Sequence, residues 1–202
     1  MAVKLRDEQR LERFLAAART IISKKRSIDF TVQEVVEQSH QSLRSFYQHF
    51  DGKHELLLTL FEDALRQAAE RIRAAAAGQD QPLARLRVAV ELLFEQSRRA
   101  PAAARPLFTD FASRLLISHP AEMKAAHAPL LTLLTELMEQ AEAGGALRGG
   151  SSPRRLAALT MQTVMFTAQA SGAAGDQAGY PITAAEAWEF CATGFAGSVD
   201  HG

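Results

Sequence analysis

Cysteine is almost absent from this chain: Cys191 is the only one in 202 residues, so no internal disulfide can form. A lone thiol gives no reason to place the protein in an oxidising compartment. Valine and isoleucine are sparse beside alanine, which favours helix because alanine loses the least conformational freedom on entering one. The contents of 47% hydrophobic and 23% charged residues are those of a folded globular chain. We therefore expect an all-α fold.

Export signals and long apolar runs are also missing. The first fourteen residues become charged at once and contain no apolar core of the kind that a signal peptide needs. The most apolar stretch, Leu156 to Ala170, is interrupted by threonine and glutamine and is shorter than the roughly 20 apolar residues of a membrane span. We expect a cytoplasmic protein without a membrane partner.

Catalytic and metal-binding motifs are absent as well. The six histidines are scattered, without an HExxH pair or a cysteine and histidine cluster at zinc spacing. The sequence contains no glycine-rich phosphate loop and no G-x-S-x-G elbow. We therefore expect that the protein is not an enzyme and uses neither a cofactor nor a metal ion.

The formal net charge is zero, but the two parts of the chain differ. Residues 1–53 contain ten Lys and Arg against seven Asp and Glu, whereas residues 54–202 contain thirteen against sixteen. A basic segment can be the electrostatic footprint of a nucleic-acid partner. An imbalance of three charges arises easily by chance, so it supports such a partner only together with a motif.

Periodicity and capping signals predict a helix-turn-helix near the N-terminus. Apolar residues at three- and four-residue intervals predict a helix over residues 6–24. Thr31 and Glu34 have the spacing of a capping box, so a short helix should begin at Thr31 and end near Ser39. Ser42 is a second candidate N-cap, for a helix over residues 43–50. Two short helices behind a longer one form the helix-turn-helix pattern.

The rest of the chain reads as further helices. The expected ranges are residues 53–77, 82 to before 101, 106–119, 120–143, 154–171 and 183–197. Pro129 lies inside the fourth range, either as a kink or as the start of a new helix. Thr183 and Glu186 repeat the capping-box spacing at the start of the last helix.

The segment Thr31 to Leu57, TVQEVVEQSHQSLRSFYQHFDGKHELL, resembles the DNA-binding head of the tetracycline-repressor (TetR) family. The match is densest in Ser42 to Phe50, followed by Lys53 and Leu56. The resemblance implies a three-helix DNA-binding head at residues 1–52 and a helical ligand-binding and dimerisation domain at residues 53–202. The whole chain would then contain about nine helices.

Two residues of the turn depart from the family pattern, which usually has glycine and then an aliphatic residue. His40 stands at the glycine position, and histidine tolerates a left-handed backbone better than most residues. Gln41 stands at the aliphatic position, where it could find a polar partner, face outward, or reach DNA.

A recognition helix that enters the major groove presents its first turn to the base edges. Arg44 is the best candidate reader, because its guanidinium can donate two bonds to guanine at about 1–3 kcal/mol of discrimination. The resemblance implies that Tyr47, His49 and Lys53 contact phosphate or order the helix ends; the alternative for Tyr47 and His49 is that they only pack the head. The complete predicted DNA-binding set is Thr31, Gln41, Ser42, Leu43, Arg44, Ser45, Tyr47, His49 and Lys53.

The resemblance also implies a hydrophobic small-molecule ligand and a homodimer. The residues expected to contact the ligand are Phe94, Phe108, Phe111, Leu115, His127, Met138, Gln162 and Met165. Those expected at the dimer interface, on the last two helices, are Leu156, Leu159, Thr163, Phe166, Trp188, Cys191 and Phe195.

Together these features predict a transcriptional regulator, in the first instance a repressor. It would bind a palindromic double-stranded operator as a homodimer and be released by a hydrophobic inducer. The alternative is a helical protein-interaction or scaffold module that does not bind specific DNA, which His40, Gln41 and the zero net charge would allow.

Overall fold

The computed structural model describes residues 2–98, 104–148, 150, 152–173 and 182–196. The helices are α1 (Ala2–Lys25), α2 (Val32–Ser39), α3 (Leu43–His49), α4 (Lys53–Ala76), α5 (Pro82–Arg98), the π-helix η1 (Leu107–Phe111), α6 (Ala112–Ser118), α7 (Pro120–Ala126), α8 (Ala128–Ala143), α9 (Pro153–Ala173) and α10 (Ala184–Phe195). The described residues form no strand beyond one isolated bridge between Leu147 and Ala196. The all-α prediction is confirmed. None of the described helices combines the length and apolar composition that crossing a bilayer requires.

The prediction of about nine helices was slightly low, since ten α-helices and one π-helix are present among the described residues. Pro129 lies in the first turn of α8, where its missing N–H leaves no helical bond unmade. It therefore starts a new helix after α7 instead of kinking a single long one. The helix predicted from Pro106 begins with the π-helical η1 before it continues as α6.

Two compact units make up the chain, and neither is continuous in sequence. The first contains residues 1–64 and 100–126, and the second contains residues 65–99 and 127–202. Helix α4 begins in the first unit and ends in the second. The division at residue 52, which concerns the limits of a DNA-binding head, stays a prediction.

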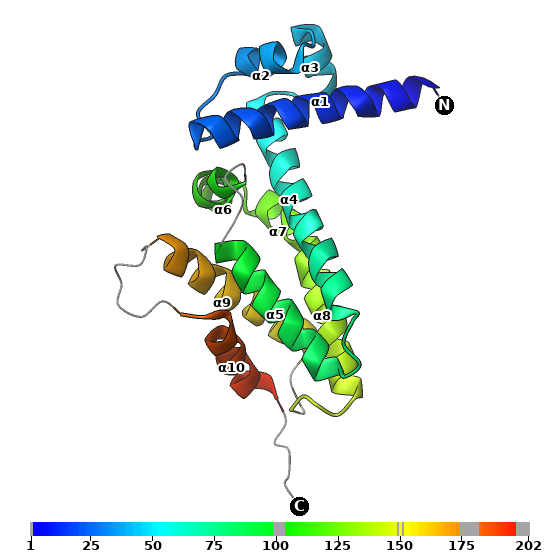
Figure 1. Ribbon diagram of the computed structural model, residues 1–202, viewed down its shortest axis with the longest axis vertical. Helices are drawn as coiled ribbons and strands as arrows, with labels where there is room; N and C mark the ends of the chain where they lie inside the picture. The colour runs from blue at the N-terminus through cyan, green and yellow to red at the C-terminus, as the bar shows by residue number, and fades with distance from the viewer. Residues whose placement is uncertain (1, 99–103, 149, 151, 174–181, 197–202) are drawn as a thin grey trace, which may run out of the picture. The chain divides into compact units, whose positions relative to one another are not determined.

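The core of the N-terminal three-helix segment is built from phenylalanine rings. Figure 1 shows α2 and α3 lying against α1. The Phe46 ring of α3 meets the Phe14 ring of α1 edge to face, with centroids 5.5 Å apart, and lies 5.3 Å from the Phe50 ring. All three side chains are buried. Helices as short as α2 and α3 are marginal in water, so packing against α1 stabilises them, and for α3 this packing includes the aromatic cluster.

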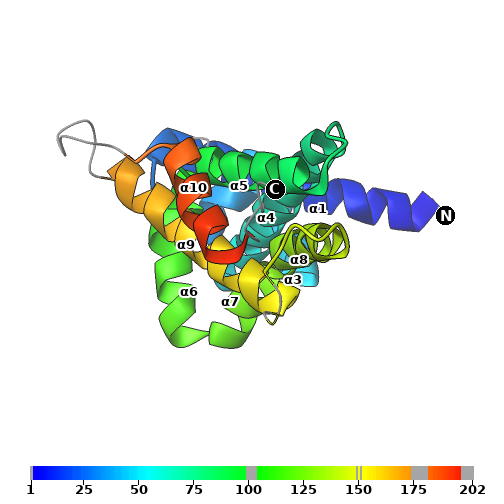
Figure 2. The same ribbon diagram turned by 90° about the horizontal axis from the view of Figure 1, so that it is seen from below.

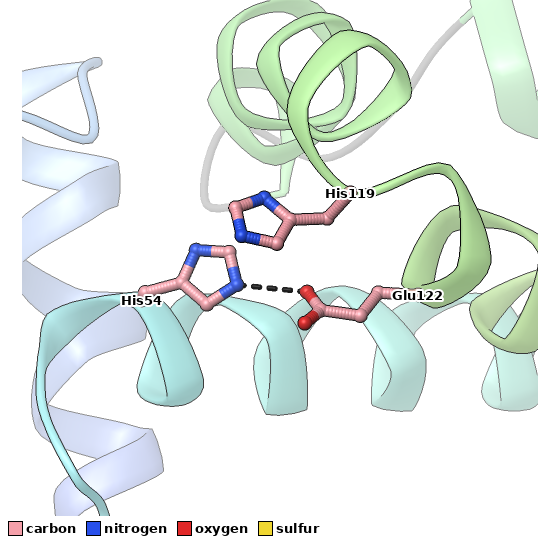
Figure 3. Close-up of side chains that lie close together, drawn as sticks. All are labelled: His54, His119 and Glu122. Carbon is pink, nitrogen blue, oxygen red and sulfur yellow. Dashed lines mark hydrogen bonds and ion pairs between the residues drawn. The ribbon is translucent and has the colours of Figure 1, made fainter.

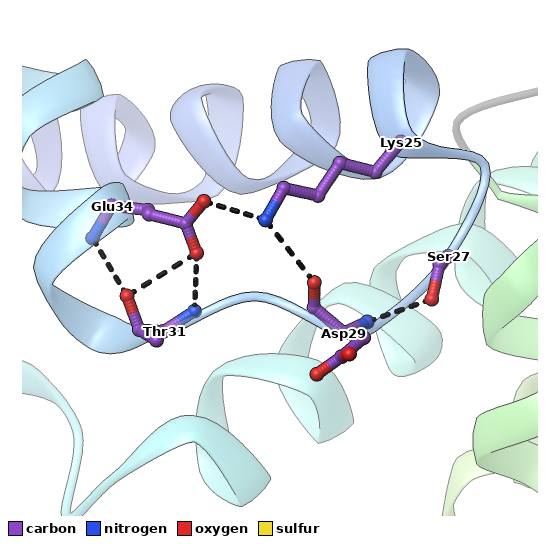
Figure 4. A network of polar contacts seen from close by, with 5 residues as sticks. All are labelled: Lys25, Ser27, Asp29, Thr31 and Glu34. Atoms are coloured by element: carbon purple, nitrogen blue, oxygen red, sulfur yellow. Dashed lines mark hydrogen bonds and ion pairs between the residues drawn. The ribbon is translucent and has the colours of Figure 1, made fainter.

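The predicted capping box at the start of α2 is confirmed. The Thr31 hydroxyl accepts a hydrogen bond from the Glu34 amide at 3.2 Å, and the Thr31 amide donates to the Glu34 carboxylate at 2.7 Å. The same carboxylate forms an ion pair with Lys25 at 2.5 Å, which connects the end of α1 to the start of α2 (Figure 4). The hydrogen bond from Lys25 is the main reason that the pKa of Glu34 lies below its ordinary value. The link between α1 and α2 is thus stabilised by an ion pair and by the capping box at the start of α2.

In the second unit, α9 packs against both α5 and α8, and α10 packs against α5 and α9. Figure 2 shows α10 lying beside α9 at the surface of this unit. Phe94 of α5 and Met138 of α8 are fully buried in the core. The second predicted capping box is confirmed, because Thr183 and Glu186 exchange the same pair of bonds at the start of α10. The predicted end of this helix at Gly197 lies outside the described residues.

Candidate nucleic-acid interface

The turn between α2 and α3 depends on a left-handed residue, as predicted. His40 has φ 54° and ψ 35°, in the region that glycine adopts most easily. Its amide donates to the Glu37 carbonyl at 3.2 Å, and the Gln41 amide donates to the Val36 carbonyl at 3.3 Å. These bonds satisfy the last carbonyls of α2, so the turn forms with histidine in place of glycine.

Gln41 is half-buried, and its side-chain amide donates to the His40 carbonyl at 3.1 Å. It therefore finds a polar partner within the turn itself. The side chain also lines a depression beside α3, so contact with DNA stays open to it. The polar residue thus replaces an aliphatic one without being left unsatisfied.

The first turn of α3 is partly exposed, as are Tyr47 and Gln48 in its second turn. The Ser42 hydroxyl accepts from the Ser45 amide at 3.1 Å and caps the helix, as predicted. Leu43 and Arg44 are exposed. Ser45 is buried, and its hydroxyl has no hydrogen-bond partner among the described residues. The end of the helix that would enter a groove thus exposes Ser42, a leucine and an arginine, while Ser45 is buried.

Beside this turn lies an open depression of about 280 Å³. Its lining residues are Arg10, Gln41, Ser42, Arg44, Ser45 and Gln48. Two of these six are arginines and none is acidic, so the depression favours an anionic partner. The sequence interpretation missed Arg10 and Gln48. The basic excess of residues 1–53 was the only available signal for Arg10, because only folding brings α1 next to α3.

Tyr47 and His49 have different environments. The Tyr47 side chain is exposed and its ring lies edge to face on Phe46 at 5.5 Å, so the hydroxyl end is free to contact a partner. The side chain of His49 is only 11% exposed, and its ring packs against Phe14 and Phe50. Packing of the head is the role that this position favours for His49.

Thr31 and Lys53, the predicted DNA-binding residues at the starts of α2 and α4, also differ. The Thr31 amide already donates to Glu34, so a phosphate there would have to displace that carboxylate. Lys53 begins α4, and its ammonium group lies 4.7 Å from the centroid of the Phe30 ring, as in a cation–π contact. Burial lowers the pKa of Lys53 from its ordinary value. Both residues are therefore already engaged within the chain, Thr31 by Glu34 and Lys53 by the Phe30 ring.

The predicted ligand-contacting residues are divided between the two units. Phe108, Phe111 and Leu115 belong to the first unit, where the Phe108 and Phe111 rings pack on Phe61. The members in the second unit are Phe94, His127, Met138, Gln162 and Met165. Among them, Phe94 and Met138 are fully buried and Gln162 is exposed. A ligand that touched Phe94 or Met138 would have to displace packed atoms.

The predicted dimer residues fall into a buried and an exposed group. Trp188, Cys191 and Phe195 are buried within the chain, and burial raises the pKa of the Cys191 thiol. Leu156 and Thr163 are half-buried, and Leu159 and Phe166 are exposed.

The sequence interpretation missed Phe190, which is 72% exposed beside an open groove of about 550 Å³ between α9 and α10. The signal that could have identified Phe190 is that it is a large aromatic residue on a different face of the helix from Trp188, Cys191 and Phe195.

This chain is similar in fold to several solved structures, although no family model and no curated protein matches its sequence. Among solved structures, FadR from Bacillus subtilis in complex with stearoyl-CoA has a TM-score of 0.71 at 16% identity, over 91% of this chain and 98% of that one. A TetR-family transcriptional repressor, FadR from Thermus thermophilus in complex with lauroyl-CoA, has a TM-score of 0.69 at 22% identity, over 90% of each chain.

A third similar structure is SmeT, the repressor of a multidrug efflux pump of Stenotrophomonas maltophilia. It has a TM-score of 0.69 at 15% identity, over 94% of this chain and 91% of that one. The described residues thus form an all-helical fold with a helix-turn-helix in α2 and α3. More narrowly, the chain has the fold of the TetR-family transcriptional regulators, as the sequence resemblance predicted.

Proposed function

We propose that this protein is a ligand-responsive transcriptional repressor that binds a palindromic operator as a homodimer in the cytoplasm and is released by a hydrophobic small molecule. The observation that carries the proposal is the first turn of α3, where the exposed Arg44 lines one depression together with Arg10 and no lining residue is acidic. Such a helix end can enter the major groove while the basic surface around it attracts the phosphate backbone.

Homodimerisation is supported by the apolar surface of α9 and α10. Phe166 and Phe190 are exposed on these two helices, which contact each other within the second unit. Exposed apolar patches of this kind mark interaction sites. A second copy of the same surface would cover them in a two-fold arrangement, and the two heads would then face two half-sites.

A hydrophobic inducer is supported by the similar solved structures. Two of those proteins hold acyl-CoA molecules, and a third represses an efflux pump. We infer that a long-chain acyl thioester is the first ligand to test. To release DNA, the ligand must bind the released conformation more tightly than the DNA-bound one.

The decisive experiment is a fluorescence-anisotropy titration of the protein with the DNA upstream of its own gene and with scrambled DNA of equal length. We expect the specific DNA to bind at least about a thousandfold more tightly than the scrambled DNA. Stearoyl-CoA is then added to the complex, and a fall in anisotropy is expected. Equal affinity for both DNAs would favour the helical interaction module. Release by free coenzyme A alone would contradict a hydrophobic trigger.

We expect Arg44→Ala and Lys53→Ala to weaken DNA binding in different ways. Arg44→Ala should reduce the free energy of binding to the specific DNA by about 1–3 kcal/mol, because a base contact is lost. The loss with scrambled DNA should be much smaller. Lys53→Ala should weaken both DNAs alike and lower the slope of log affinity against log salt by about one, because a phosphate contact is lost. Anisotropy titrations at several salt concentrations measure both effects.

Arg87→Ala is the matched control, since it removes a surface arginine of the second unit that is paired with Glu91. It should leave both DNA affinities unchanged. An equal loss of specific and non-specific affinity in Arg44→Ala would exclude base reading by this residue.

A further inference from the structure

Three side chains outside the proposed DNA and ligand sites converge within the first unit. His54 is the second residue of α4, His119 lies between α6 and α7, and Glu122 is in the first turn of α7. Figure 3 shows the three side chains pointing toward one another. The His54 Nε2 and Glu122 Oε2 atoms are 2.8 Å apart, and the two imidazole centroids are 4.7 Å apart. One ligand atom from each of the three lies within 4.8 Å of the others.

The hydrogen bonds of Ser118 determine which nitrogen of His119 is free. The Ser118 hydroxyl donates its one proton to the Arg114 carbonyl at 2.8 Å. The hydroxyl oxygen, 2.8 Å from Nδ1 of His119, must therefore accept from that nitrogen. The proton of the neutral imidazole then sits on Nδ1 and leaves a lone pair on Nε2. A hydrogen bond that fixes the tautomer in this way is the usual support of a metal-binding histidine.

The site is open to an ion from solution, because the side chains of His54 and Glu122 are 46% and 36% exposed.

The donor set identifies the kind of ion. Two imidazoles and one carboxylate form a zinc ligand set that leaves a fourth position for water. Magnesium and calcium prefer oxygen ligands alone. In a tetrahedral site with bonds of about 2.1 Å, the ligand atoms are about 3.4 Å apart, so these side chains need to move by only about 1.5 Å.

We propose that His54, His119 and Glu122 bind one zinc ion. The ion would join the start of α4, directly after Lys53, to the junction of α6 and α7, and so stabilise this arrangement of the first unit. The sequence predicts no metal site, because the His119-x-x-Glu122 spacing alone supplies two ligands and the third is 68 residues from Glu122. This inference does not depend on the proposed DNA binding.

The test is isothermal titration calorimetry of the chelator-treated full-length protein with zinc chloride. We expect one zinc ion to bind per chain. His54→Gln, His119→Gln and Glu122→Gln should each weaken zinc binding by about 100-fold or more, which exceeds the usual effect of losing a residue that only supports a metal ligand. Each variant is checked for native helix content by circular dichroism. His40→Asn is the matched control, because it removes an exposed histidine where asparagine also tolerates the left-handed backbone, and it should bind zinc normally.

Two further measurements separate a metal site from a general effect on folding. Cobalt(II) should show the visible absorption of a tetrahedral complex in the wild type and lose it in Glu122→Gln. Ser118→Ala should keep the site but weaken zinc binding by about 10- to 100-fold, because His119 loses its tautomer support. Unchanged zinc affinity in the double variant His119→Gln/Glu122→Gln, or equal binding of magnesium, would overturn the proposal.

Discussion

Phe46→Ala is expected to destabilise the first unit by about 3–5 kcal/mol, the largest effect of any single substitution considered. The Phe46 ring is fully buried and contacts the rings of Phe14, Tyr47 and Phe50. Alanine would remove this contact surface and leave a cavity beside α3, whose only other buried residue is Ser45. We also expect loss of DNA binding, because α3 is held in place through this ring.

Chemical denaturation monitored by circular dichroism and by tryptophan fluorescence can measure the effect in each unit separately. The single tryptophan, Trp188, belongs to the second unit. The transition measured by far-ultraviolet circular dichroism should therefore move to lower denaturant more than the transition measured by tryptophan fluorescence. Tyr47→Ala is the matched control, because it removes a neighbouring but exposed ring and should cost about 1 kcal/mol or less. A loss below about 1 kcal/mol in Phe46→Ala would contradict the central role of this ring.

The double variant Phe166→Asp/Phe190→Asp is expected to turn the proposed dimer into a monomer. The two rings are 76% and 72% exposed in the single chain. Burying one phenylalanine side chain is worth about 1.5–3 kcal/mol, and two-fold symmetry counts each substitution twice. Aspartate would also place unpaired charges in the interface. The dimer dissociation constant should rise by at least about 1,000-fold.

Sedimentation velocity at micromolar concentration measures this change in mass, and operator titration measures its consequence. A monomer presents one head, so affinity for a two-half-site operator should fall while the helix content stays native. Ile117→Asp is the control, since Ile117 is an 86% exposed apolar residue of α6 in the first unit. It should leave the mass unchanged. A wild-type protein that is monomeric at this concentration and still binds its operator would remove the dimer from the proposal.

Local signals in the sequence were sufficient to locate most helix starts. The capping boxes at Thr31 and Thr183 form as predicted, because each depends on residues only three positions apart. The left-handed His40 follows from the short connection between α2 and α3, which any helix-turn-helix must make. Pro129 left two alternatives open, and the structure resolved them in favour of a new helix.

The sequence by itself determined the helical class and the residues at the exposed end of α3, since both depend on neighbours along the chain. Contacts between distant segments were decided only by the tertiary structure. It brought Arg10 beside Arg44, buried Trp188 while leaving Phe190 exposed, and placed His54 next to Glu122. Helical periodicity shows that a residue lies on a given face. Which faces meet depends on the packing of whole helices, and one sequence does not encode that packing locally.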